Sequence, residues 1–145
     1  MRTALLVAVL LISTSSLANP ISCADAKVLI VFGKSAQFPD TAEAVLTASI
    51  GERSTVLRYD GNIDFIGAEC RKTSRGKSFV VFQAFCGGSG CKDLDNFGII
   101  DPKDLRILLV PDDSNHSIAK QIFGSEVAPI ANPLSVRRAY ERLFP

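Results

Sequence analysis

The most unusual segment of the sequence runs from Cys86 to Cys91 and reads CGGSGC. Four residues separate the cysteines, whereas a thiol redox motif has two, so the spacing does not indicate disulfide-exchange catalysis. Ser89 is not the centre of a nucleophile elbow either, because Cys91 stands where the second glycine should be. If a disulfide closes the segment, it is a tight projecting loop that acts as a binding tip or anion-binding nest, or only a stapled turn between strands. The predicted binding residues are Gly87, Gly88, Ser89 and Gly90.

The remaining reactive residues form no catalytic or metal-binding pattern. His116 is the only histidine, and no neighbour in the sequence qualifies as its nucleophile. Because the chain has one histidine, a zinc site would also need cysteines, and these are better explained as disulfides. A calcium-loop pattern can be aligned with four residues, but Phe97 breaks its fifth position. Those four residues are Asp93, Asp95, Gly98 and Asp104. We therefore expect no catalytic residue, no metal and no cofactor, while Asn115-His116-Ser117 fits a glycosylation acceptor.

The N-terminus has the order of a secretory signal. Arg2 precedes an apolar run from Ala4 to Ile12, and Ser16 and Ala18 supply the small residues before a cut. We expect residues 1–18 to be a cleavable signal peptide and the mature protein to be periplasmic or secreted. The apolar run is too short to span a bilayer, so no integral membrane segment is expected after processing. A lipidated Cys23 is the nearest alternative.

Residues 19–145 are predicted to form a single globular domain. The full chain has 16 basic and 15 acidic residues, so loss of Arg2 with the signal leaves a net charge of zero. This balance argues against a nucleic acid or an anionic membrane as the partner, since both reward a clustered positive field. The basic run from Arg71 to Lys77 is interpreted as a solvated turn.

Four cysteines in an exported chain favour disulfides, because the destination is oxidising. Three pairings are possible and the sequence alone does not choose among them. We favour Cys86 with Cys91, which flank a flexible turn, and Cys23 with Cys70.

The expected elements of the first half begin with a strand over Val28 to Phe32, buried on both faces. A helix is predicted from Asp40 to Gly51, because Ala42, Val45, Leu46 and Ile50 recur at helical spacing. Short strands follow at residues 55–59 and 63–66 around the turn Asp60-Gly61-Asn62.

The second half begins with the most convincing strand, Phe79 to Phe85, whose two alternating sets are both apolar. A hairpin is expected to join residues 97–100 to 105–110 across Asp101-Pro102-Lys103-Asp104. Ser114 is predicted to cap a short helix that ends at Gly124, and a last helix to start at Asn132-Pro133. This order predicts an α+β fold, with a largely antiparallel sheet packed against two or three helices.

At Cys86 and Cys91 the chain resembles the periplasmic Ivy-type inhibitors of vertebrate lysozyme. In that family a strand enters a disulfide loop with four residues between its cysteines, and the loop plugs the active-site cleft of the enzyme. The resemblance covers residues 79–110, and only the two cysteines match the motif. Family members carry a loop histidine, whereas this loop is Gly-Gly-Ser-Gly.

The sequence thus favours an exported protein-binding domain, such as an inhibitor or immunity protein acting on a cell-wall hydrolase through its disulfide-closed loop. Rigid closure of the loop would lower the entropy lost on binding. Two alternatives remain open, a small secreted enzyme without a recognisable triad and a structural component of the envelope.

Overall fold

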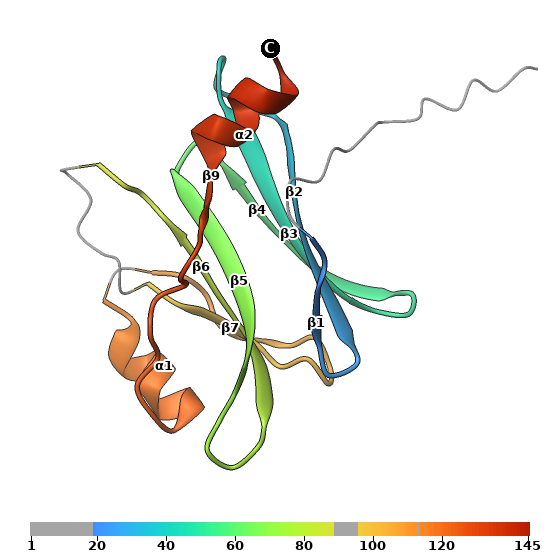
Figure 1. Cartoon of the computed structure of the whole chain (residues 1–145), viewed down its shortest axis with the longest axis vertical. Coiled ribbons are helices and arrows are strands. Elements are labelled where there is room, and N and C mark those ends of the chain that lie inside the picture. Colours follow the sequence, from blue (N-terminus) through green and yellow to red (C-terminus); the bar gives the residue numbers. More distant parts are fainter. Residues whose placement is uncertain (1–18, 89–95, 113) are drawn as a thin grey trace, which may run out of the picture.

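A computed structural model describes residues 19–88, 96–112 and 114–145 and has an α+β fold, as predicted (Figure 1). The first sheet has the spatial order β1 (Ile21–Cys23), β2 (Ala26–Lys34), β3 (Ala42–Ile50) and β4 (Arg53–Asp60). The second has the order β8 (Ile107–Leu109), β7 (Gly98–Ile100), β6 (Ser78–Phe85), β5 (Phe65–Lys72) and β9 (Leu134–Ser135). The helices are α1 (His116–Phe123) and α2 (Val136–Leu143). All strand pairs are antiparallel.

The main core lies between the two sheets. Alternate residues of β2 and β3 meet inward-facing residues of β5, β6 and β7, and Val136 and Ala139 of α2 join the same cluster. Helix α2 lies at one end of both sheets and contacts β2 and β3 (Figure 1). A disulfide between Cys23 of β1 and Cys70 of β5 links the sheets, which confirms one of the two predicted pairs.

A second, smaller core covers the other face of β6 and β7. Phe79, Val81 and Ile99 pack there against Ala119 and Phe123 of α1. Because β6 has neighbours on both edges and a core on each face, six of its eight residues are buried. The predicted strand over residues 79–85 is therefore confirmed as a central strand with two buried faces.

No helix within the described part of the chain is both long and apolar enough to cross a membrane.

The helix predicted from Asp40 to Gly51 is wrong, because this segment is strand β3. Four apolar residues alternate with more exposed ones and are at most 1 % exposed, which is the period of a strand against a core. They are Ala42, Ala44, Leu46 and Ala48. The high helix propensity of alanine is overridden by pairing with both β2 and β4. Gly51 does not end a helix but opens the two-residue turn to β4, with φ +55°.

Burial on both faces is also wrong for β2. Ala26, Val28, Ile30 and Phe32 are buried, while the residues between them are partly or fully exposed. Sheet 1 therefore has one face against the core and one face toward solvent, as antiparallel sheets commonly do. The next predicted strand, at residues 63–66, begins two residues later and continues to Lys72 as β5.

The hairpin β7–β8 and the short helix after it form, but β8 covers only Ile107–Leu109 instead of 105–110, because the turn extends from Asp101 to Arg106. Ser114 is not the helix cap. Asn115 precedes α1, and its side chain is turned away from the helix into the core, where it is 4 % exposed. Its amide donates to the carbonyl oxygens of Phe97 and Val110 and accepts from the N–H of Phe97. The triplet Asn115-His116-Ser117 is therefore a poor glycosylation acceptor in the folded protein, because the Asn115 amide is buried and hydrogen-bonded. Gly124 ends the helix in the left-handed conformation, as predicted.

The last helix begins later than Asn132-Pro133 predicts. Residues 134 and 135 pair with β5 as β9, and α2 starts at Val136. The cap is Ser135, whose hydroxyl oxygen accepts from the N–H of Arg138 at 3.3 Å. Because Leu134 and Ser135 pair with β5 as the edge strand of the second sheet, helix α2 begins only at Val136.

Candidate binding site at the α2 end of the domain

The predicted loop leaves the second sheet at the end of β6. Cys86, Gly87 and Gly88 are exposed, and Cys86 is disulfide-bonded. The other predicted loop residues, Ser89, Gly90 and Cys91, lie outside the described residues, so the predicted pairing of Cys86 with Cys91 stays a prediction. What the structure describes is the base from which the loop starts.

Asp64 holds this base together through three hydrogen bonds. Its carboxylate oxygen Oδ2 accepts from the N–H of Gly87 at 2.7 Å. Its own N–H donates to the carbonyl oxygen of Phe85, and its carbonyl oxygen accepts from the N–H of Val136, both at 2.9 Å. One residue thus connects the end of β6, the start of β5 and the start of α2.

Gly87 also packs directly on an aromatic pair. The rings of Phe65 and Phe85 stack with their centroids 5.4 Å apart. A Cβ atom at Gly87 would lie 2.4 Å from Cε2 of Phe65, much closer than van der Waals contact allows. A glycine is therefore required at this position for the chain to pass so close to the Phe65 ring.

Residues 125–133 cross the second sheet as a strap that leads to β9. Arg71 donates two hydrogen bonds to Oε2 of Glu69, at 2.9 and 2.7 Å, and reaches the carbonyl oxygens of Ala128 and Pro129. Oε1 of Glu69 in turn accepts from the N–H of Ala131 at 3.1 Å. The solvated turn predicted for residues 71–77 is therefore wrong for Arg71, which lies in β5 and is committed to holding this strap.

These contacts change the pKa of the Glu69 carboxyl. Partial burial raises its pKa, but the hydrogen bonds from Arg71 and from the N–H of Ala131, together with the Arg71 charge, outweigh burial and hold the pKa below its usual value. The strap is pinned again at Ile130, whose N–H donates to the buried Oε1 of Gln83 at 2.7 Å. These contacts fix where β9 and α2 begin.

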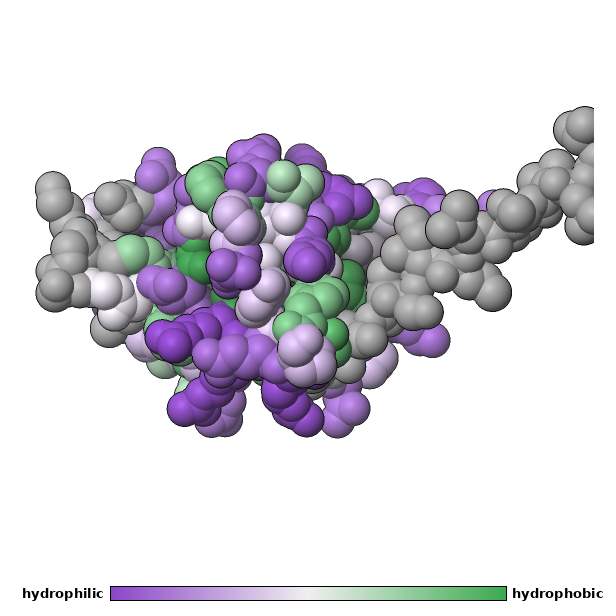
Figure 2. All heavy atoms as spheres, turned by 90° about the horizontal axis from the view of Figure 1, so that it is seen from above, coloured by the Kyte–Doolittle hydropathy of each residue, from purple (hydrophilic) through white to green (hydrophobic). Residues whose placement is uncertain are grey.

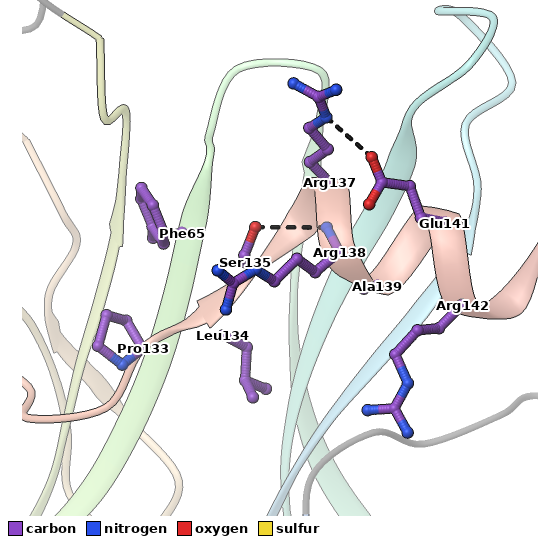
Figure 3. A pocket seen from close by; sticks show the side chains of 9 residues that line it. All are labelled: Phe65, Pro133, Leu134, Ser135, Arg137, Arg138, Ala139, Glu141 and Arg142. Carbon is purple, nitrogen blue, oxygen red and sulfur yellow. Dashed lines mark hydrogen bonds and ion pairs between the residues drawn. The ribbon is translucent and has the colours of Figure 1, made fainter.

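A groove lies beside the loop base, between α2 and the start of β5 (Figure 3). Its volume is about 710 Å³. Its lining includes the apolar and partly buried side chains of Phe65, Pro133 and Leu134. A smaller hollow of about 280 Å³ shares Phe65, Ser135 and Arg137 with the groove and extends to Gly87 and Gly88. Loop base and groove thus form one continuous surface at the α2 end.

Three arginines of α2 line this groove. Arg137 pairs with Glu141 one turn later, at 2.9 Å between Nε and Oε1. Arg138 and Arg142 lie four residues apart, hence on one side of the helix, and neither has an ion pair within the described residues. In Figure 3 the guanidinium of Arg138 extends past Ser135, while Arg142 projects one turn further along the helix.

His116, the only histidine, lies away from this surface. It is the first residue of α1, which Figure 1 places at the other end of the molecule from α2. Its Nε2 is 3.1 Å from Oε2 of Glu126, and Lys120 contacts the same carboxylate. The hydrogen bond and charge of Lys120, with a smaller part from His116, lower the pKa of Glu126. These three side chains form an exposed ion cluster.

Among residues 19–88, 96–112 and 114–145, no group of three His, Cys, Asp or Glu side chains is placed to hold a metal ion. Asp93 and Asp95 of the calcium-loop pattern lie outside these residues.

Comparison with protein-family profiles, with curated protein sequences and with solved structures finds no match for the chain. The assignment of a function therefore depends on the site itself.

The sequence predicts the loop, which stays a prediction beyond Gly88, and it carries no indication of the groove. Asp64 reads as one more polar residue after a turn, and its role depends on three segments that meet only in the folded chain. The arginines had a weak signal, since Arg137, Arg138 and Arg142 fall outside the apolar face of the predicted last helix. The sequence does not indicate that these arginines lie beside the loop.

Proposed function

We propose that this protein is an exported binding domain that recognises a protein partner through the loop at residues 87–90. The N-terminal signal pattern and the Cys23–Cys70 disulfide both suit an oxidising compartment outside the cytoplasm. Within that class, we propose that the partner is a cell-wall hydrolase. The domain inhibits this enzyme or acts as an immunity protein against it. The resemblance to the Ivy-type inhibitors supports insertion of the loop into the cleft of such an enzyme.

The observation that carries the proposal is the construction of the loop base. Gly87 is hydrogen-bonded to Asp64 and packed on Phe65, and it follows a disulfide-bonded cysteine at the end of the central strand. A loop that starts from such a base loses less conformational entropy on binding than a free loop would. Because the loop has no histidine, recognition would depend on its shape and its backbone amides.

The test is capture of a partner by the mature protein, residues 19–145, from an extract of its native compartment. The loop variant is Gly88→Trp, which adds a large side chain to an exposed position. The matched control is Ser74→Trp, an equally bulky change at an exposed position in the turn at the other end of β6. We expect capture by the wild type and by Ser74→Trp, and loss of capture by Gly88→Trp, at unchanged melting temperatures.

A second readout separates inhibition from simple binding. Turbidity clearing of a cell-wall suspension by the same extract should slow when wild-type protein is added, and should not slow with Gly88→Trp. Equal capture by wild type and Gly88→Trp would contradict the role of the loop. Capture without any change in lytic activity would contradict the hydrolase as the partner.

A further inference from the structure

The groove beside α2 has the size and composition of a site for a segment of a partner. Its volume of about 710 Å³ falls within the range of about 300 to 1,000 Å³ found for pockets that bind small molecules and cofactors, so it has room for a group of side-chain size. Its apolar lining side chains are partly buried, whereas its charged lining residues are exposed and are called its rim here. Such a groove can bury an apolar side chain of a bound segment while its rim selects the charges around that side chain.

The charge of the rim is positive. Arg137, Arg138 and Arg142 face one acidic lining residue, Glu141, so the groove has a net charge of +2. Arg137 is partly neutralised by Glu141, which leaves the guanidinium groups of Arg138 and Arg142 available for an incoming anion. Guanidinium groups bind carboxylates with two parallel hydrogen bonds, which adds both energy and geometric selectivity.

We infer that this groove binds an acidic segment of the protein partner, in which carboxylates pair with Arg138 and Arg142 and an apolar side chain rests on Phe65 and Leu134. The inference rests on the proposed function only in taking the partner to be a protein. It adds to that function that the recognised surface of the partner is acidic, and that a second contact region lies beside the loop.

A polyanion such as a nucleic acid fits the groove less well. Glu141 is paired with Arg137 and interrupts the arginines, so the groove presents two separate cations and not a continuous cationic track for a row of phosphates. The domain without its signal also has a formal charge of zero and thus no long-range field to attract a polyanion. Figure 2, which looks down on the α2 end, shows hydrophilic side chains interspersed with separate apolar ones.

The groove is also held in shape before anything binds. Ser135 caps α2, Asp64 ties the start of α2 to the loop base, and the strap before β9 is fixed by Arg71 and Glu69. A partner therefore meets a preformed site, and little binding energy is spent on ordering it.

The experiment uses a defined probe and the mature protein. The probe is a fluorescein-labelled short peptide in which Glu and Leu alternate, and the reference peptides carry Gln or Lys in place of Glu. Binding is followed by fluorescence anisotropy, and the site is located from amide chemical shifts. The variant is Arg138→Glu/Arg142→Glu. The control is Arg53→Glu/Lys103→Glu, which makes the same change in charge at exposed positions remote from α2.

We expect the Glu peptide to bind at least about tenfold more tightly than the Gln peptide, and the Lys peptide not to bind. Shifts should be confined to Phe65 and residues 133–142. The Arg138/Arg142 variant should lose about tenfold or more in affinity, while the control variant should bind as the wild type does. Raising the salt from about 0.15 M to about 1 M should weaken binding, because the screening length falls from about 8 Å to about 3 Å.

Three results would overturn the inference. They are equal affinity for the Glu and Gln peptides, shifts located elsewhere, and tighter binding of a single-stranded oligonucleotide than of the Glu peptide. These outcomes are distinguishable from failure of the proposed function. If Gly88→Trp loses partner capture but the wild type does not bind the Glu peptide, only the groove inference is contradicted. If the wild type binds the Glu peptide but captures no partner, only the loop hypothesis is contradicted.

Discussion

The disulfide between Cys23 and Cys70 should contribute about 4 kcal/mol to the stability of the domain. The two residues are 47 positions apart, and closing a loop of that length in the unfolded chain gives about 4 kcal/mol in the chain-entropy account. The bond also joins the short strand β1 to the opposite sheet, so its removal leaves β1 held by its pairing with β2 and by packing alone. For a domain of this length, 4 kcal/mol corresponds to about 15 °C in melting temperature.

The perturbation is the double variant Cys23→Ala/Cys70→Ala. Alanine is chosen because Cys23 is completely buried, and serine would add a hydroxyl without a partner to the core. The lost sulfur atoms also remove some packing, which adds to the loss rather than offsetting it. Urea unfolding at neutral pH, followed by circular dichroism, measures the change in unfolding free energy.

The pair Cys86→Ala/Cys91→Ala is the matched comparison. A ring of this size gives only about 2 kcal/mol in the same account, so its loss should be about half as large. A loss of less than about 1 kcal/mol for the Cys23/Cys70 variant would refute the reasoning. So would a larger loss for the Cys86/Cys91 variant than for the Cys23/Cys70 variant.

Three further predictions concern single residues of the core and its margins. Asn115→Ala leaves buried backbone groups without their partners and should cost about 3 kcal/mol in urea unfolding; a cost below about 1 kcal/mol would mean that the amide bonds are unimportant. Burial raises the pKa of Tyr59 to about 12, so the neutral phenol stabilises the fold up to about pH 10 and this contribution is lost as the pH rises further. Absorbance titration should show one tyrosine ionising near pH 12, and Tyr59→Phe should remove that step. Glu69 and Asp101 have lowered pKa values in the folded state, so their stabilisation is present above their usual pKa and is lost as the pH falls below about 4. Glu69→Gln should flatten the fall in unfolding free energy between about pH 5 and pH 2, and an unchanged slope would contradict its role.

Several parts of the fold could be predicted because one local signal dominated. The apolar residues of β6 occupy both alternating sets, so its central position could be recognised. Asp101 and Pro102 mark the start of the turn of the β7–β8 hairpin, which extends to Arg106, and Gly124 ends α1 in the left-handed conformation. In each case the residue type required by the local geometry allowed only one plausible interpretation.

The prediction failed for other parts of the fold, where two periodicities fitted the same residues. In β3, apolar residues satisfy a helical and an alternating pattern together, and only pairing with β2 and β4 selects the strand. Asn115 offered a glycosylation signal, yet its amide joins Phe97, just before β7, to Val110, just after β8. The groove at α2 could not be predicted, because it requires the positions of Asp64, Arg71 and the strap in three dimensions.

The most direct measurement of the central claim is the affinity of the captured partner for wild type, Gly88→Trp and Ser74→Trp. Surface plasmon resonance with immobilised mature protein gives the three dissociation constants under one condition. If the loop enters the partner, Gly88→Trp should weaken binding by about a hundredfold or more and Ser74→Trp should leave it unchanged. Equal dissociation constants for all three proteins would contradict the account.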